Sequence, residues 1–288
     1  MRFLLFLLGF GLLSALCLLG ENSQAQEVAS PSVVFAPHRA LYTLTLGSVK
    51  TGGVANDVSG QIAFEWQDVC DGWAIQQRMD MHIVSSEGDE QNIRTQQVTW
   101  EAKDGSAYRF NMRNEQDGQE PEIYKGKAVR NPKKDAVTVS YVLPTPKTVS
   151  MPLDTLFPTA HMALILNQAR HPTGDGIPFF FRRVFDGSDS EGVSDVSALI
   201  LSPRRADQEK GLSKTLKALP LLSGDSWPLS MAFFNIKGQT ETPAYEMKLS
   251  LMPSGIARAV DIDYQTFTVT GTLTEFDALP PLDCPSHE

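Results

Sequence analysis

The chain has 288 residues, of which 42% are hydrophobic and 20% are charged, and its formal net charge is −9. This length is enough for one large β domain or for two small domains. The acidic balance argues against nucleic acid as a partner and against tight binding to anionic lipid, because both favour a basic protein face.

The N-terminal segment has the features of a secretory signal peptide. Arg2 precedes an apolar run over residues 3–19, and residues 23–25 (Ser-Gln-Ala) supply small residues at a cleavage position. A transmembrane anchor is the alternative, but the run is marginal for a bilayer span of about 20 residues. We therefore predict a signal peptide over residues 1–25. The mature protein is then expected in the periplasm of a Gram-negative cell, and not as an integral membrane protein.

Cleavage removes Cys17 and leaves two cysteines, Cys70 and Cys284. In an oxidising compartment, a disulfide between two such residues is the expected state, and two unrelated thiols are the alternative. Zinc and thioredoxin-type sites are disfavoured because neither cysteine lies in a Cys-x-x-Cys pair. The bridge would tie an early strand to the C-terminal tail.

Alternation of apolar and polar residues dominates the rest of the chain. Residues 26–36 are small and polar and predict a flexible N-terminus, followed by a single domain over 37–288. A period of two, broken by turn pairs such as Asp71-Gly72, is typical of antiparallel strands with one solvated face. We expect strands near 38–46, 58–66, 73–83, 91–101, 106–113, 121–130, 136–143, 178–186, 193–202, 229–237, 243–252, 256–263 and 265–275.

Residues 158–170 break this alternation and predict the main helix. Pro158 suits the first helical position, and apolar residues lie on nearly every side of the segment. A helix of that kind is usually buried. We expect it to pack into the concave face of a curled sheet. Residues 203–219 are polar and predict an exposed loop or a short amphipathic helix.

The sequence offers little for catalysis. His161 is the one histidine whose predicted position allows burial to tune its pKa, although a core histidine is the more common case. Ser226, in Gly224-Asp225-Ser226, resembles an esterase nucleophile block but lacks the strand-to-helix elbow that such blocks occupy. No phosphate loop, dinucleotide fingerprint or metal-ligand spacing occurs. We predict no catalytic residue, no cofactor and no metal, and therefore a protein that is not an enzyme.

Two aromatic runs, Phe179-Phe180-Phe181 and Phe233-Phe234, place rings on both sides of a strand. Either both faces of the strand are covered there, or one face lines a ligand groove. The core interpretation is the more common of the two.

Five short blocks occur in order along the chain, and the C-terminal cysteine follows them. They are Ala-Pro-His-Arg-Ala-x-Tyr-x-Leu at 36–44, Leu-Phe-Pro-Thr-x-His at 156–161, Val-Phe-Asp-Gly-Ser-Asp at 184–189, Trp-Pro with Phe-Phe at 227–234, and Pro-x-Tyr-Glu at 243–246. Together they resemble the EipB cell-envelope integrity family of the alphaproteobacterial periplasm. The resemblance covers about residues 36–285.

The resemblance implies a mainly β fold, an antiparallel, spiral-like broken β-barrel with one buried helix at about 158–170. It implies a disulfide between Cys70 and Cys284 and gives no catalytic residue. It also implies support of the envelope under stress through protein contacts, with a periplasmic tetratricopeptide-repeat protein as a candidate partner. The alternative is a carrier for lipid or another hydrophobic ligand, because a curled sheet that holds a helix can form an apolar cleft.

Overall fold

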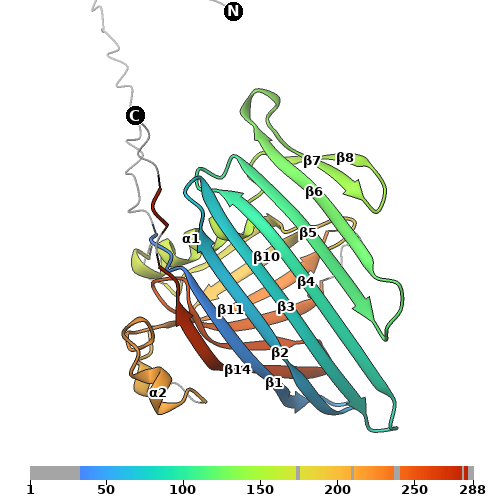
Figure 1. Ribbon diagram of the computed structural model, residues 1–288, viewed down its shortest axis with the longest axis vertical. Helices are drawn as coiled ribbons and strands as arrows, with labels where there is room; N and C mark the ends of the chain where they lie inside the picture. The colour runs from blue at the N-terminus through green and yellow to red at the C-terminus, as the bar shows by residue number, and fades with distance from the viewer. Residues whose placement is uncertain (1–32, 173–175, 209–210, 237–240, 281, 285–288) are drawn as a thin grey trace, which may run out of the picture. The chain divides into compact units, whose positions relative to one another are not determined.

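The computed structural model describes residues 33–288 except 173–175, 209–210, 237–240, 281 and 285–288 (Figure 1). The predicted signal peptide and residues 26–32 of the predicted flexible segment lie outside the described residues. At 33–36 the chain is already packed: Phe35 is buried and its ring stacks on Trp66 at a centroid distance of 4.6 Å. The main-chain N–H of Ala36 donates to the Ser254 carbonyl over 3.0 Å. The folded domain therefore begins before the boundary predicted at residue 37.

Within the described residues, fourteen strands form one antiparallel sheet in the order β8-β7-β6-β5-β4-β3-β2-β1-β14-β13-β12-β11-β10-β9. Two meanders, β1 to β8 and β9 to β14, are joined by the pairing of β1 with β14 (Figure 1). The strands are β1 His38–Val49, β2 Ala55–Asp68, β3 Gly72–Ser85, β4 Glu90–Ala102, β5 Ala107–Gln116, β6 Glu122–Asn131, β7 Ala136–Leu143, β8 Lys147–Pro152, β9 Phe179–Phe185, β10 Val193–Ile200, β11 Trp227–Asn235, β12 Tyr245–Leu251, β13 Ala257–Asp263 and β14 Phe267–Ala278.

The period-two pattern produces the core directly. Tyr42 lies opposite Ile62, and Ile62 lies opposite Met79, so the apolar set of each strand meets the apolar set of the next. Such cross-strand rows are the main stabilising contacts of a sheet with one solvated face. All thirteen predicted strands are present, and the broken antiparallel barrel is confirmed. The short strand β8 was not predicted.

Helix α1, Pro158–Arg170, fills part of the inner face. Ile165 and Leu166 are fully buried in a cluster that includes Trp66 of β2, Val196 of β10 and Leu251 of β12. The helix is therefore buried against the sheet, as the sequence predicted, and the strands that bury it belong to both meanders. Shorter helical segments are α2 Lys214–Lys217 and the 3-10 turns Pro132–Lys134, Ala206–Gln208 and Pro220–Leu222.

A single bridge joins the edge strand β9 to the segment that follows the other edge strand, β8. Leu156, which follows β8, pairs in parallel with Val184 of β9. Its N–H donates to the Arg183 carbonyl over 2.8 Å, and its carbonyl accepts from the Phe185 N–H over 2.9 Å. Toward residue 177, no strand among the described residues pairs with that side of β9. The barrel is broken along this stretch.

Candidate functional site

A buried carboxylate holds the start of α1. Phe157, the residue before the helix, offers no side-chain cap, but Glu101 of β4 accepts hydrogen bonds from the N–H groups of Thr159 and Ala160 at 2.7 and 2.8 Å. A negative charge is favourable at the positive end of a helix dipole. Burial nevertheless raises the pKa of Glu101 to about 7, against the lowering effect of these hydrogen bonds and of Arg130. Glu101 thus joins α1 to the sheet.

Glu101 was missed by the sequence analysis, although its position held a signal. It lies two residues after Thr99, and both side chains are buried while Val98 is exposed. The period of two therefore places a carboxylate on the inner face of β4. An ionisable group there needs hydrogen-bond partners, and the first N–H groups of a helix supply them.

His161 is a core residue in its environment. Its side chain is buried, and its ring meets the Phe180 ring edge-on at 6.1 Å. Burial and, to a smaller extent, the charge of Arg182 together lower its pKa to about 4, so the ring is neutral near pH 7. Nε2 has no hydrogen-bond partner among the described residues. This environment does not provide the oriented partner that a general base needs.

His161 is not the only buried histidine, which corrects the sequence analysis. His38 is buried between the rings of Phe64 and Phe276, each with its centroid 5.6 Å away. Its Nδ1 lies 2.7 Å from the Ala36 carbonyl oxygen, and burial lowers its pKa. The neighbours that bury His38 come from β2 and β14, and the sequence around residue 38 does not reveal them.

Ser226 belongs to a buried polar network. It is fully buried, its Oγ lies 2.8 Å from Ser250 Oγ, and it accepts a hydrogen bond from the Arg258 guanidinium. Arg258 is also buried and donates to the carbonyls of Leu222 and Gly224 at 3.1 and 2.9 Å. These contacts hold the terminal nitrogens of the buried guanidinium, so Ser226 has a structural role.

Cys70 and Cys284 form a disulfide, with their Cα atoms 5.4 Å apart and a sequence separation of 214 residues. Cys70 lies in the turn between β2 and β3, and Cys284 lies beyond the end of β14. The bond attaches the C-terminal segment to that turn. Among the described residues, no group of three His, Cys, Asp or Glu side chains could hold a metal ion. No helix in the same residues has the length and apolarity to cross a bilayer.

The C-terminal half of β9 is enclosed. We call Val184, Phe185 and the loop 186–192 the sealed end. Phe185 is completely buried, with edge-on contacts to the rings of Tyr108 and Phe110 at 6.1 and 5.4 Å. The loop carbonyls accept hydrogen bonds from β5 and β7: Tyr108 to Asp186 at 3.0 Å, Asn114 to Ser188 at 3.4 Å and Tyr141 to Asp189 at 3.3 Å.

Local residue choices make this closure possible. Gly187 has φ +69, and a Cβ at this position would lie 2.5 Å from the Phe110 ring. Only glycine tolerates both conditions. In the other meander, Arg130 of β6 donates to the carbonyls of Leu153 and Thr155, and its guanidinium lies 5.4 Å above the Phe157 ring. These contacts fix the segment before α1 to β6.

The N-terminal half of β9 is exposed. We call residues 177–181 the free edge. Ile177 and Phe179 are each 64% exposed, and Phe181 is 48% exposed. Because Leu156 bonds to residues 183 and 185, the odd-numbered residues of β9 direct their main-chain groups away from β10. The core interpretation of this aromatic run is wrong for Phe179 and Phe181. Only Phe180 points inward, where it meets His161.

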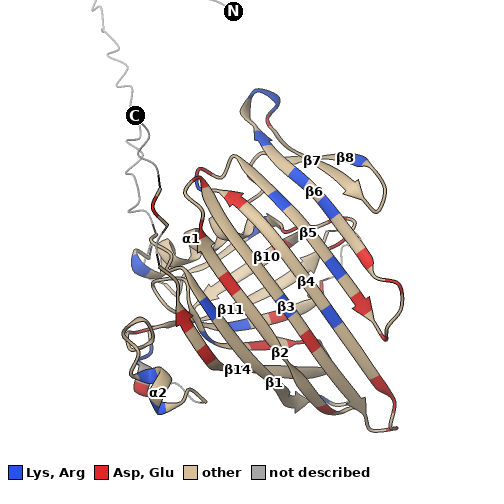
Figure 2. Cartoon of the chain, viewed as in Figure 1, with Lys and Arg blue, Asp and Glu red and all other residues tan. Residues whose placement is uncertain are grey.

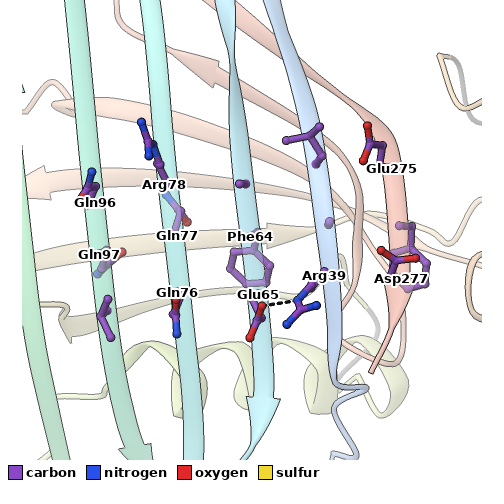
Figure 3. A pocket seen from close by; sticks show the side chains of 15 residues that line it. Arg39, Phe64, Glu65, Gln76, Gln77, Arg78, Gln96, Gln97, Glu275 and Asp277 are labelled. Atoms are coloured by element: carbon purple, nitrogen blue, oxygen red, sulfur yellow. Dashed lines mark hydrogen bonds and ion pairs between the residues drawn. The ribbon is translucent and has the colours of Figure 1, made fainter. Parts of the chain in front are cut away.

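A groove of about 470 Å³ with both polar and apolar lining runs along β1 to β4 and β14 (Figure 3). Arg39 at its lower end forms an ion pair with Glu65, and Arg78 pairs with Asp80 at 2.8 Å. The remaining lining includes the amides Gln76, Gln77, Gln96 and Gln97 and the acids Glu275 and Asp277. The groove can offer hydrogen bonds to a polar solute, but both of its arginines are already neutralised by carboxylates.

The fold and these sites define a class of protein: a broken antiparallel β-barrel that encloses the helix α1 and contains a disulfide. The chain belongs to the EipB-like family, whose model matches residues 29–280. This confirms the family resemblance seen in the sequence. The cell envelope integrity protein EipB of Brucella abortus (strain 2308) is 26% identical over 255 residues, or 86% of each chain.

A solved structure has the same fold. The β-barrel-like protein of a domain of unknown function from Brucella abortus matches with a TM-score of 0.75 and 22% sequence identity. The match covers 86% of this chain and 100% of that chain. At this level of identity the likeness establishes the fold.

Proposed function

We propose that this protein supports the integrity of the cell envelope from the periplasm, without catalysis, by binding another protein through the free edge. The Brucella relative is named for envelope integrity, which supports the first part of the proposal. The free edge is the observation that carries the second part. Exposed strand edges are normally protected, because their unpaired main-chain groups invite another strand.

The free edge combines the two elements of recognition by strand addition. Its main-chain groups at residues 179 and 181 face away from β10 and can pair with an added strand. Its three exposed apolar side chains lie on one face, because they alternate along the strand. Phe181 also contacts Phe234 of β11 at 6.0 Å, which extends the apolar surface away from the edge. A partner would thereby gain both hydrogen bonds and apolar contacts.

The partner must displace one internal contact. The Arg182 guanidinium donates to the Phe181 carbonyl over 2.8 Å and covers that acceptor. An acidic side chain on the partner could draw this guanidinium away while a main-chain N–H replaces it. A periplasmic tetratricopeptide-repeat protein is the candidate that the family resemblance implies, and repeat proteins present extended concave surfaces.

The non-enzymatic part of the proposal is supported by the two residues that could have suggested catalysis. Ser226 is enclosed with Arg258 and Ser250, and His161 is neutral and enclosed by aromatic contacts. A hydrolase would need a reachable nucleophile beside a base. These environments supply neither.

The carrier alternative receives less support from the position of α1. An apolar ligand would have to replace Ile165 and Leu166, which are buried among strands of both meanders. It would also have to separate Glu101 from the first turn of α1. Stoichiometric lipid in mass spectra of the purified protein would favour the carrier instead.

Replacing Phe179 and Phe181 together by Ser tests the proposed function. The double variant should fold normally but fail to restore detergent resistance to cells that lack the protein. A photo-crosslinker at position 179 should give a discrete product with a second protein in cells.

The matched control replaces Val49 and Val54 by Ser, two exposed apolar residues at the β1–β2 turn. The control should restore resistance fully, and a crosslinker at position 54 should give no discrete product. Full rescue by the Phe179→Ser/Phe181→Ser variant would refute a role for the free edge.

A further inference from the structure

A second surface differs from the rest of the molecule in its charge. Five cations lie on β5, on β6 and in the turn after β6, and all five are exposed: Arg109, Lys125, Lys127, Lys133 and Lys134. We call them the basic face. Figure 2 shows blue segments along β5 and β6 and in the β6–β7 turn. This face lies on the β1–β8 meander, whereas the free edge belongs to the other meander.

Strand register places the central cations together. Arg109 lies directly opposite Lys127, and Asn111 lies opposite Lys125, so the three charges share one face of the sheet. Like charges in opposite positions are unfavourable in a sheet unless something compensates for them. No ion pair among the described residues includes any of the five cations of the basic face.

The neighbouring strands arrange their charges differently. Arg94 of β4 pairs with Asp80 at 2.7 Å and with Glu115 at 3.4 Å. Arg78 pairs with the same Asp80, and Arg39 pairs with Glu65. Arginines of β1, β3 and β4 thus form ion pairs with carboxylates, whereas Lys125 and Lys127 of β6 form none with the described residues. The net charge of −9 conceals a local excess of positive charge.

Apolar groups lie between the cations. Trp100 lies opposite Arg109, and the guanidinium stacks 4.5 Å above the indole ring. Val98 of β4, Val129 of β6 and Leu143 of β7 are exposed large apolar residues. Leu143 lies directly opposite Lys125. Cations interleaved with aliphatic side chains and a tryptophan are typical of surfaces that rest in the headgroup region of a bilayer.

We propose that the basic face docks this protein on an anionic lipid surface that carries phosphate headgroups. Charge complementarity selects the anionic partner, and the residue types select lipid over protein. Four of the five cations are lysines, which are depleted at protein interfaces. A lysine is a flexible, strongly hydrated point charge, which suits mobile headgroups better than a fixed carboxylate pattern. The expectation that an acidic chain avoids anionic lipid is thereby reversed for this one face.

The test uses purified protein with vesicles of phosphatidylcholine containing about 30% phosphatidylglycerol, and vesicles of phosphatidylcholine alone. Co-sedimentation should show binding to the anionic vesicles only. Binding should weaken strongly when salt is raised from about 0.05 M to about 0.5 M, because the Debye length shortens. The triple variant Lys125→Gln/Lys127→Gln/Lys134→Gln should bind about 100-fold more weakly, since each lysine near such a surface contributes about fivefold.

A matched control removes the same charge elsewhere. Lys50, Lys214 and Lys248 are exposed and lie outside the basic face, and their triple Gln variant should bind within about twofold of the wild type. Thermal unfolding verifies that both variants fold. Equal losses in the two variants, or no binding by the wild type, would overturn the proposal. So would binding to soluble polyglutamate without binding to vesicles, which would assign the face to an acidic polypeptide.

Discussion

The two ends of β9 carry similar residues in opposite surroundings. Phe185 is 0% exposed and Phe179 is 64% exposed, although they lie six residues apart in one strand. At the sealed end Leu156 pairs with the outer side of the strand, whereas at the free edge no described strand does so. The difference shows that burial of an aromatic residue depends on the chain that crosses it, and not on the strand that contains it.

The contrast also separates two uses of an exposed edge. At one end, contacts of Arg130, Phe157 and Gly187 help to close the barrel. At the other end it leaves large rings in water, which costs solubility unless a partner covers them. We infer that the sealed end stabilises the fold and that the free edge serves the function. Variants at the two ends should then affect different measurements.

The largest expected effect on stability comes from the Cys70–Cys284 disulfide, which belongs to neither the sealed end nor the free edge. Cys70→Ser opens a covalent loop of more than 200 residues, and loop-closure entropy predicts a loss of about 5 kcal/mol as an upper value. Denaturant unfolding measures it. Cys284→Ser and the double variant should lose the same amount as Cys70→Ser. Envelope protection at permissive temperature should persist, because the free edge is unchanged.

The next effect concerns a residue packed beside the sealed end. Phe157→Ala removes a completely buried ring that stacks on Tyr108 at 5.3 Å, and should lower the free energy of unfolding by about 3–5 kcal/mol. Phe179→Ala at the free edge is the control and should change it by less than about 0.5 kcal/mol. Hydrogen exchange should accelerate at Phe185 only in the first variant. Similar losses in both variants would contradict the assignment of separate roles.

Much of this contrast could not be predicted from sequence. The period of two located the strands and the apolar run located α1, because both patterns are local. Strand β8 was missed, since residues 147–152 are few and end at a proline, as a loop would. The exposure of Phe179 was missed because strand order decides which strand has an open edge, and strand order depends on distant pairing.

The same limit applies to polar residues. Glu101 and His38 are buried by α1, β2 and β14, none of which adjoins them in sequence. The basic face was missed for a different reason: total charge contains no information on position. Parity along each strand would have placed Glu101 inward and Lys125 and Lys127 outward. The odd or even position of a residue in its strand therefore predicts which face of the sheet its side chain occupies, and composition does not.

The smallest expected effect is a change of the unfolding free energy with pH. Glu101 has a pKa of about 7 in the folded protein against an ordinary value of 4.5. Between these values the folded state binds the proton more tightly, so the stability contributed by this group falls as pH rises from about 4.5 to 7. Its part of the change should be about 1–3 kcal/mol, because one pKa unit corresponds to about 1.4 kcal/mol. Unfolding free energies across this pH range measure it.

Glu101→Gln isolates this contribution from other titrating groups. The Gln carbonyl can still accept from the Thr159 N–H, so the start of α1 keeps a hydrogen bond without a charge. The variant should lose the pH dependence assigned to Glu101, and its stability relative to the wild type should be greatest near pH 7. Glu65→Gln, at a partly exposed carboxylate paired with Arg39, is the comparison. If Glu101→Gln and the wild type vary identically with pH, the helix is held by an uncharged contact and the ionisation of Glu101 is irrelevant to the start of α1.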